Sequence, residues 1–143
     1  MDKEPRLRAS TQSIAKLKDK LRVIFRLGRG RNIGRLIKEE LNPVIRGWGN
    51  DFSLSRVKKI PEELDFWIRR KLRCIIWRQM RRRKTRGKRM IERGLSRARA
   101  WESATNGQGP WWNAGASHMN QAYPITYFNE LGLVNLMTKL TNS

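Results

Sequence analysis

Side chains that could perform catalysis are few and scattered in this chain of 143 residues. The only histidine, His118, follows Ser117, but two residues adjacent in sequence do not form a triad, and no nearby carboxylate would orient the imidazole. The four aspartates, at positions 2, 19, 51 and 65, include no adjacent pair that could hold magnesium for phosphoryl transfer. One cysteine and one histidine cannot form a zinc site. We therefore expect no enzyme activity from the chain alone, and neither a metal nor another cofactor.

The abundant chemistry is that of cations. The chain has 32 Lys and Arg residues against 12 Asp and Glu, a formal net charge of +20. A compact body with this imbalance repels itself, and a polyanion relieves the repulsion. Residues 66–101 hold 15 of the basic residues and one acid, Glu92, whereas residues 102–143 hold a single lysine. Nucleic acid is the leading partner, and an anionic membrane surface is the second.

Membrane insertion is not expected. The apolar run at 74–77 is far shorter than the roughly 20 residues of a membrane-spanning helix, and no apolar signal segment follows the N-terminus. The single cysteine of the chain, Cys74, is interpreted as a small buried hydrophobic residue. The absence of a disulfide framework favours a reducing compartment, so we expect a cytoplasmic protein.

Helical periodicity predicts the elements that carry these cations. A helix over 11–27 has its apolar stripe at Ile14, Leu17 and Leu21, N-cap candidates at Ser10, Thr11 and Ser13, and a stop at Gly28. Asn32 can cap a second helix, with its stripe at residues 33, 36, 37 and 41. Pro43 then marks a break, a kink or a new first turn, before a stripe that runs from Val44 to Phe52 and contains Gly47 and Gly49, which permit close packing.

The strongest helix is predicted over 61–84, with Pro61 at its first position and acidic residues in its first turn. Seven of the nine residues in 81–89 are basic, which favours a mobile or irregular link there. Further helices are expected over 96–104 and over 127–140. No strand alternation is visible. The pattern predicts an all-α protein, a small helical bundle followed by a loosely packed helical C-terminal region.

Six tryptophans lie in or beside the basic segments. Trp67 falls on the apolar stripe of its helix and is expected in the core, whereas Trp77 lies off that stripe. Trp111 and Trp112 follow a Gly-Pro turn, and two adjacent rings are not easily both buried. One of them could stack on a base or wedge between base steps, and the alternative is that they pack the tail onto the body. We favour packing for at least one ring.

Four segments resemble a known family. They read LNPVIRGWGNDF (41–52), ELDFWIRRKLRCIIWRQM (63–80), KTRGKRMIERGLS (84–96), and GPWWNAGASHMNQAYP followed by YFNELGLVNL (109–136). Together they resemble the C-terminal part of bacterial group II intron-encoded proteins, the multidomain reverse transcriptase/maturases. The resemblance extends from about residue 11 to residue 140.

The resemblance implies two regions: a thumb or maturase (X) region over 1–80, and a basic linker with a DNA-binding region over 81–143. The implied partners are group II intron RNA, whose folding and splicing the protein would assist, and a target DNA. Basic residues expected at the RNA are Arg46, Arg69, Arg70, Arg73, Arg78, Arg81, Arg82, Arg83, Lys84, Arg86, Lys88 and Arg89. Residues considered for DNA contact are Arg93, Arg97, Trp111, Trp112, Asn113 and His118.

The catalytic palm of that family, with its Tyr-x-Asp-Asp motif, is missing, as is the zinc-dependent endonuclease region. The chain therefore looks like a free-standing fragment, without polymerase activity of its own. Three alternatives to an RNA-binding splicing cofactor stay open. They are one part of a split RNA-directed DNA polymerase whose palm is separately encoded, a DNA-binding module alone, and a decayed remnant without a stable fold.

Overall fold

The computed structural model describes residues 3–53 and 59–136, with side chains described over 12–48 and 61–136. All secondary structure in these residues is helical, so the predicted all-α class is confirmed. The helices are α1 (Lys3–Leu27), α2 (Ile33–Leu36), the π-helix η1 (Ile37–Leu41), α3 (Asn42–Ser53), α4 (Lys59–Gln79), α5 (Arg83–Glu92), α6 (Arg97–Ala104), α7 (Pro110–Gly115), α8 (Ser117–Ala122) and α9 (Ile125–Glu130).

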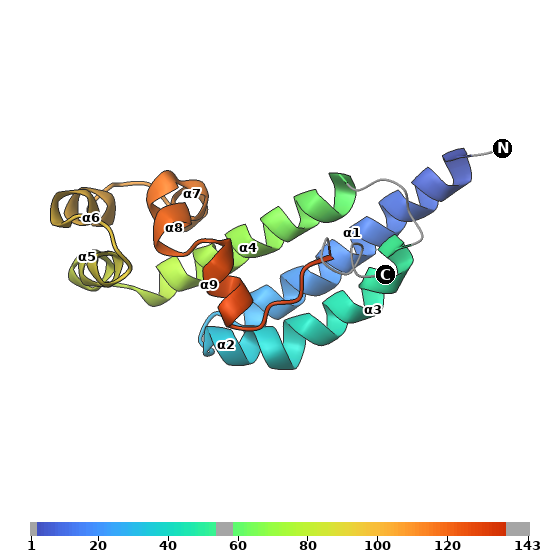
Figure 1. The fold of residues 1–143 in the computed structure, drawn as a ribbon, viewed down its shortest axis with the longest axis horizontal. Coiled ribbons are helices and arrows are strands. Elements are labelled where there is room, and N and C mark those ends of the chain that lie inside the picture. The colour runs from blue at the N-terminus through green and yellow to red at the C-terminus, as the bar shows by residue number, and fades with distance from the viewer. Residues whose placement is uncertain (1–2, 54–58, 137–143) are drawn as a thin grey trace.

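Three long helices, α1, α3 and α4, form the bundle, and α2 and η1 link the first two (Figure 1). α1 contacts both α4 and η1. The stripes predicted from the sequence supply the core, whose members in this part are Leu17, Leu21, Phe25, Ile33, Leu36, Ile37, Leu41, Ile45, Leu64, Ile68, Leu72, Ile75 and Ile76. Trp67 is only half-buried at the edge of this core, whereas Trp77 is 1% exposed and belongs to it. Trp77, which the sequence places off the apolar stripe, is therefore buried in the core.

Helix starts were predicted less well than helix faces. α1 begins at Lys3, so Ser10, Thr11 and Ser13 lie inside the helix and the predicted N-caps are wrong. The cap at Asn32 is confirmed, because its side-chain oxygen accepts a hydrogen bond from the Arg35 N–H at 3.1 Å. α4 starts at Lys59, two residues before Pro61, and ends at Gln79 instead of residue 84.

Pro43 lies in the first turn of α3, as one of the three predicted alternatives has it, and α3 follows η1 without a break. Before it, Ile37–Leu41 form the wider turn of η1, and the Asn42 N–H bonds to the Ile37 carbonyl five residues back. A wider turn accommodates a proline, which has no N–H to donate. Close packing at Gly47 is not found, since a Cβ there would meet nothing within 4 Å. The surroundings of Gly49 and the side chain of Phe52 lie outside what the structure describes.

The predicted irregular link is also wrong, because residues 83–92 form α5. α5 pairs with α6 at the end of the molecule farthest from the bundle (Figure 1). Gly87 permits this contact: a Cβ there would come within 2.8 Å of the Trp101 ring. Gly94, at φ +103°, turns the chain between the two helices, and Ser96, where the sequence predicts a helix to begin, caps α6.

The C-terminal region is more tightly packed than expected. α7 lies against α4, and Met119, Ala122 and Phe128 are fully buried. The helix predicted over 127–140 is interrupted, because α9 ends at Glu130 and Gly132 takes φ +92°; residues 137–140 lie outside the described residues. Asn42 holds this turn to the bundle, donating to the Gly132 carbonyl (2.8 Å) and accepting from the Val134 N–H (2.9 Å).

Candidate nucleic-acid interface

A basic groove lies where α4 ends and α5 begins. It encloses about 610 Å³ and is lined by Arg29, Gly30, Arg78, Gln79, Arg81, Arg86 and Pro110. Its residues come from the turn after α1, from the α4–α5 junction and from the start of α7, so only the folded chain assembles it. Four of the seven carry guanidinium groups, which bind phosphate through a planar fork.

Two side chains fix the shape of this basic groove. Gln79 donates to the carbonyls of Arg29 (3.1 Å) and Arg31 (2.7 Å), which ties the end of α4 to the turn after α1. Arg86 donates from Nε to the Met80 carbonyl at 2.7 Å, and its guanidinium lies 4.4 Å above the Trp77 ring centroid. Burial, followed by the charge of Arg83, lowers the pKa of Arg86. The wall of the groove is therefore preorganised before a ligand arrives.

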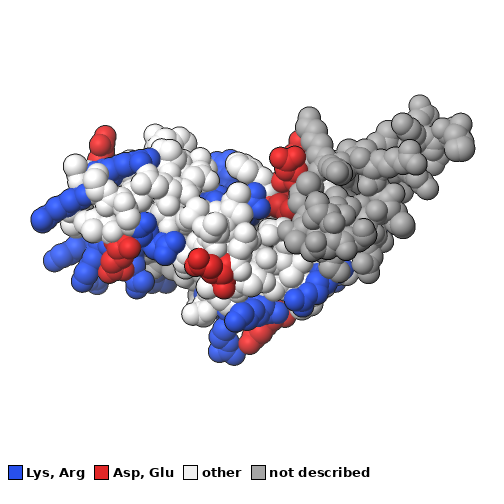
Figure 2. Space-filling view, viewed as in Figure 1, with Lys and Arg blue, Asp and Glu red and all other residues white. Residues whose placement is uncertain are grey.

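A second basic surface covers the outer side of α5. A hollow of about 550 Å³ there is lined by Arg82, Lys84, Thr85, Lys88, Arg89 and Glu92. We call these residues the α5 face. Figure 2 shows Lys and Arg side chains gathered at the end of the molecule that α5 and α6 form. Arg83 is also exposed there, and Arg46 is exposed on α3, away from both surfaces.

The arginines predicted along α4 have different environments. Arg69 is half-buried, and burial lowers its pKa against the opposing effect of Asp65. Arg70 donates to the Trp111 carbonyl from Nε (3.3 Å) and Nη2 (2.9 Å), so it joins α4 to α7. Of these α4 arginines, Arg78 lines the basic groove.

Arg73 requires a correction, because the structure places it in the interior. It is 3% exposed, its Nε donates to the Tyr123 carbonyl at 2.8 Å, and its guanidinium lies 5.4 Å from the Phe128 ring centroid. Burial, with a smaller effect from the charge of Arg69, lowers the pKa of Arg73 to about 10. Arg73 therefore joins α4 to the C-terminal region and is not available to a phosphate in this fold.

Some of the residues considered for DNA contact are exposed, and others are buried. Arg97 is exposed, as are Trp111 (39%) and Trp112 (50%), so neither ring of the tryptophan pair is buried. Arg93 donates to the Ala122 carbonyl at 2.7 Å and lies over the Tyr127 ring. Asn113 and His118 are buried, and their contact with DNA is excluded in this fold.

Asn113 and His118 instead hold α7 to α8. The Asn113 side-chain nitrogen donates to the carbonyls of Gln108 (3.1 Å) and Gly109 (2.9 Å), and its oxygen lies 2.9 Å from His118 Nε2. The imidazole sits between the rings of Trp77 and Trp112, with centroid distances of 5.7 and 6.3 Å. Burial and the nearby charge of Arg99 lower the pKa of His118.

This environment predicts a pH dependence of stability. The folded state resists protonation of His118, whereas the unfolded chain takes up the proton near the ordinary value of 6.5. The free energy of unfolding should therefore hold above pH 7 and fall as the pH drops from 7 to 5. Urea denaturation across this range checks it, with His118→Gln expected to flatten the profile. Parallel profiles for the two proteins would contradict this role of His118.

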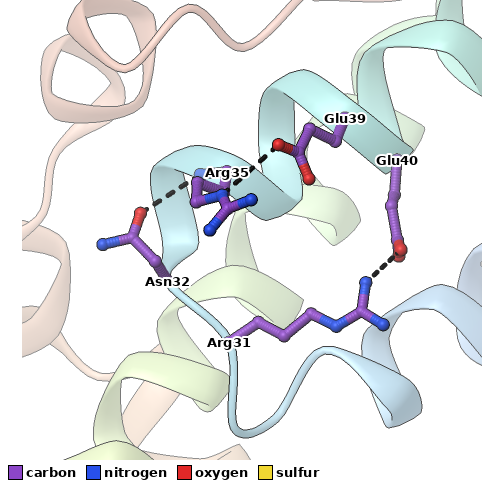
Figure 3. A network of polar contacts seen from close by, with 5 residues as sticks. All are labelled: Arg31, Asn32, Arg35, Glu39 and Glu40. Carbon is purple, nitrogen blue, oxygen red and sulfur yellow. Dashed lines mark hydrogen bonds and ion pairs between the residues drawn. The ribbon is translucent and has the colours of Figure 1, made fainter.

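Some residues of the basic groove were missed by reasoning from the sequence. Arg29 and Gln79 reach the basic groove through a turn and a helix end, whose meeting no local pattern reveals. Other cations are neutralised locally: Arg31 pairs with Glu40, and Arg35 pairs with Glu39 at 3.3 Å (Figure 3). Cys74 is half-buried rather than fully buried.

Two kinds of feature are absent from the described residues. No cluster of three or more His, Cys, Asp or Glu side chains that could hold a metal occurs among them. Within the same residues, no helix is both long enough and apolar enough to cross a membrane.

Comparison with known protein families matches residues 14–94 to the group II intron, maturase-specific domain. The match runs from α1 through α5 and therefore includes the arginines of the basic groove. Curated proteins give no match to this chain. Since the matched segment is more than half of the sequence, the chain belongs to the group II intron maturase-specific domain family.

Proposed function

We propose that this protein binds group II intron RNA and stabilises its folded, splicing-competent form. The RNA would perform the chemistry, while the protein neutralises phosphates where RNA segments approach each other. The observation that carries the proposal is the convergence of Arg29, Arg78, Arg81 and Arg86 in one preorganised groove inside the family match. The α5 face extends this surface with Arg82, Lys84, Lys88 and Arg89. Such a cofactor would act in the cytoplasm.

Filter binding of a folded group II intron RNA over a salt series tests this proposal. Each phosphate neutralised should contribute about −0.7 to −0.9 to the slope of log affinity against log salt. We expect a slope of about −3 or steeper, from four or more contacts. A slope near zero would refute RNA binding through these cations. Splicing of the same intron, with and without the protein, then tests the assistance itself.

A DNA-binding function is a second candidate, and the exposed α5 face favours it because these cations lie at a protruding end of the molecule. The proposed division of the chain at residues 80 and 81 would assign this face to the DNA-binding region. Arg97, Trp111 and Trp112 are further exposed residues available to it. Competition between intron RNA and duplex DNA at one salt concentration separates the two functions.

The split-polymerase alternative predicts a different result. In that case the chain would act with a separately encoded palm as partner. Primer extension by the purified chain alone is expected to be absent under either proposal, so the informative measurement is extension after adding a candidate palm subunit. Restored extension would support the split enzyme.

A further inference from the structure

Cations and tryptophan rings alternate across α1, α4 and α7. Lys18 Nζ and the Arg22 guanidinium lie 5.3 and 5.6 Å from the Trp67 ring centroid. Lys71 Nζ lies between two rings, 5.5 Å from Trp67 and 4.8 Å from Trp111. The Arg70 guanidinium covers Trp111 at 3.9 Å. We call these six residues the cation–ring row.

Helical spacing along α4 places two members of the row on the same helix face as an arginine of the basic groove. Trp67, Lys71 and Arg78 follow one face of α4, at intervals of four and seven residues. Eleven residues of α-helix rise about 16 Å, so this face provides an extended path. Burial lowers the pKa of Lys71; Cys74 opposes this effect, and Arg22, Arg29 and Arg78 add to it. The charges of the row therefore lie close to those of the groove.

Trp111 is held in place but keeps open surface. The two hydrogen bonds from Arg70 to the Trp111 carbonyl fix the start of α7 on α4. Gly115 leaves the space for that guanidinium, since a Cβ there would come within 2.7 Å of it. The Trp111 residue remains 39% exposed. Because the indole is already held in place and partly exposed, little conformational entropy is lost when a ligand binds to it.

We propose that the cation–ring row binds an unpaired RNA strand, with a base stacked on Trp111 and phosphates at Lys18, Arg22 and Lys71. Proteins that track single strands combine a positive path with aromatic platforms in this way. An unpaired strand suits the row better than a duplex does, because base faces inside a duplex are already stacked on their neighbours. The strand would continue from Trp111 into the basic groove. This inference rests on the proposed RNA-binding function.

The neighbouring tryptophan provides a matched test. Trp112 is exposed on the same helix, but its ring faces His118 and is outside the row. We compare Trp111→Ala with Trp112→Ala, measuring fluorescence anisotropy with a labelled 12-nucleotide uridine strand and with a hairpin whose stem is fully paired and whose loop is as short as possible. Trp111→Ala should weaken binding of the uridine strand about tenfold, the loss expected for one stacked base. Hairpin binding by this variant, and both affinities of Trp112→Ala, should change less than twofold.

A Trp111→Phe variant, which keeps an aromatic face, should recover most of the lost affinity for the uridine strand. Circular dichroism of each variant confirms folding. Equal losses for Trp111→Ala and Trp112→Ala, or equal losses for strand and hairpin, would overturn the inference while leaving the proposed function intact. Failure of the wild-type protein to bind either RNA would contradict both the inference and the proposed RNA-binding function. Displacement of the strand by polyglutamate at a lower concentration than by unlabelled uridine strand would assign the row to an acidic protein segment and overturn the inference.

Discussion

Replacing Arg73 with alanine is expected to lower the free energy of unfolding by about 2–3 kcal/mol. The Tyr123 carbonyl would lose its 2.8 Å hydrogen bond, and the space beside Phe128 would be left empty. Loss of the buried charge offsets part of this cost, because burial disfavours the charged form of Arg73. The effect should therefore be smaller than the sum of a lost charged hydrogen bond and a cavity.

Urea denaturation of paired variants separates these contributions. Arg73→Met fills most of the volume and removes the buried charge, so it should recover at least about 1 kcal/mol relative to Arg73→Ala. Arg46→Ala is the control, since Arg46 is exposed on α3 and its replacement should change stability by less than about 0.5 kcal/mol. Equal stability of the Arg46→Ala and Arg73→Ala variants would contradict the interior role of Arg73. In that case Arg73 would return to the candidates for phosphate contact.

Arg73 also shows where sequence reasoning ends. The stripes on α1 and α4 are local signals, and Leu17, Leu21, Leu64 and Leu72 are buried as their spacing predicts. An arginine between such positions reads as solvent-facing, because charged side chains are seldom buried. Only the return of the C-terminal region over α4 covers Arg73, and that contact joins residues 50 positions apart. Charge and periodicity contain no information about it.

The prediction of an irregular link over residues 81–89 was wrong for the opposite reason. Repulsion between like charges disfavours a helix, and this local argument predicted an irregular link. Packing of Gly87 and Met90 on the inner side, against α6 and the core, outweighs the repulsion. The cations then extend into solvent, and Arg86 folds back over Trp77. Composition predicted a polyanion-binding region, but the groove itself depends on tertiary contacts.

Removing two charges from this groove should produce the largest change in RNA affinity. In the double variant Arg78→Gln/Arg81→Gln, two guanidinium groups of the basic groove become uncharged amides of lower phosphate affinity. Both side chains are exposed, so the fold should persist. The slope of log affinity against log salt should become shallower by about 1.5, since each phosphate contact contributes about 0.7 to 0.9. At 0.1 M salt, affinity for folded intron RNA should fall by about tenfold or more.

A control of equal charge change distinguishes local contact from general attraction. Lys16 and Lys20 are exposed on α1 and lie in neither the basic groove nor the α5 face. The variant Lys16→Gln/Lys20→Gln also removes two positive charges, and its slope should stay within about 0.5 of the wild-type value, because no phosphate contact is lost. Equal changes in both double variants would mean that RNA responds to net charge alone. A selective loss with Arg78 and Arg81 would instead localise phosphate neutralisation to the junction of α4 and α5, where Gln79 and Arg86 hold the groove open before RNA binds.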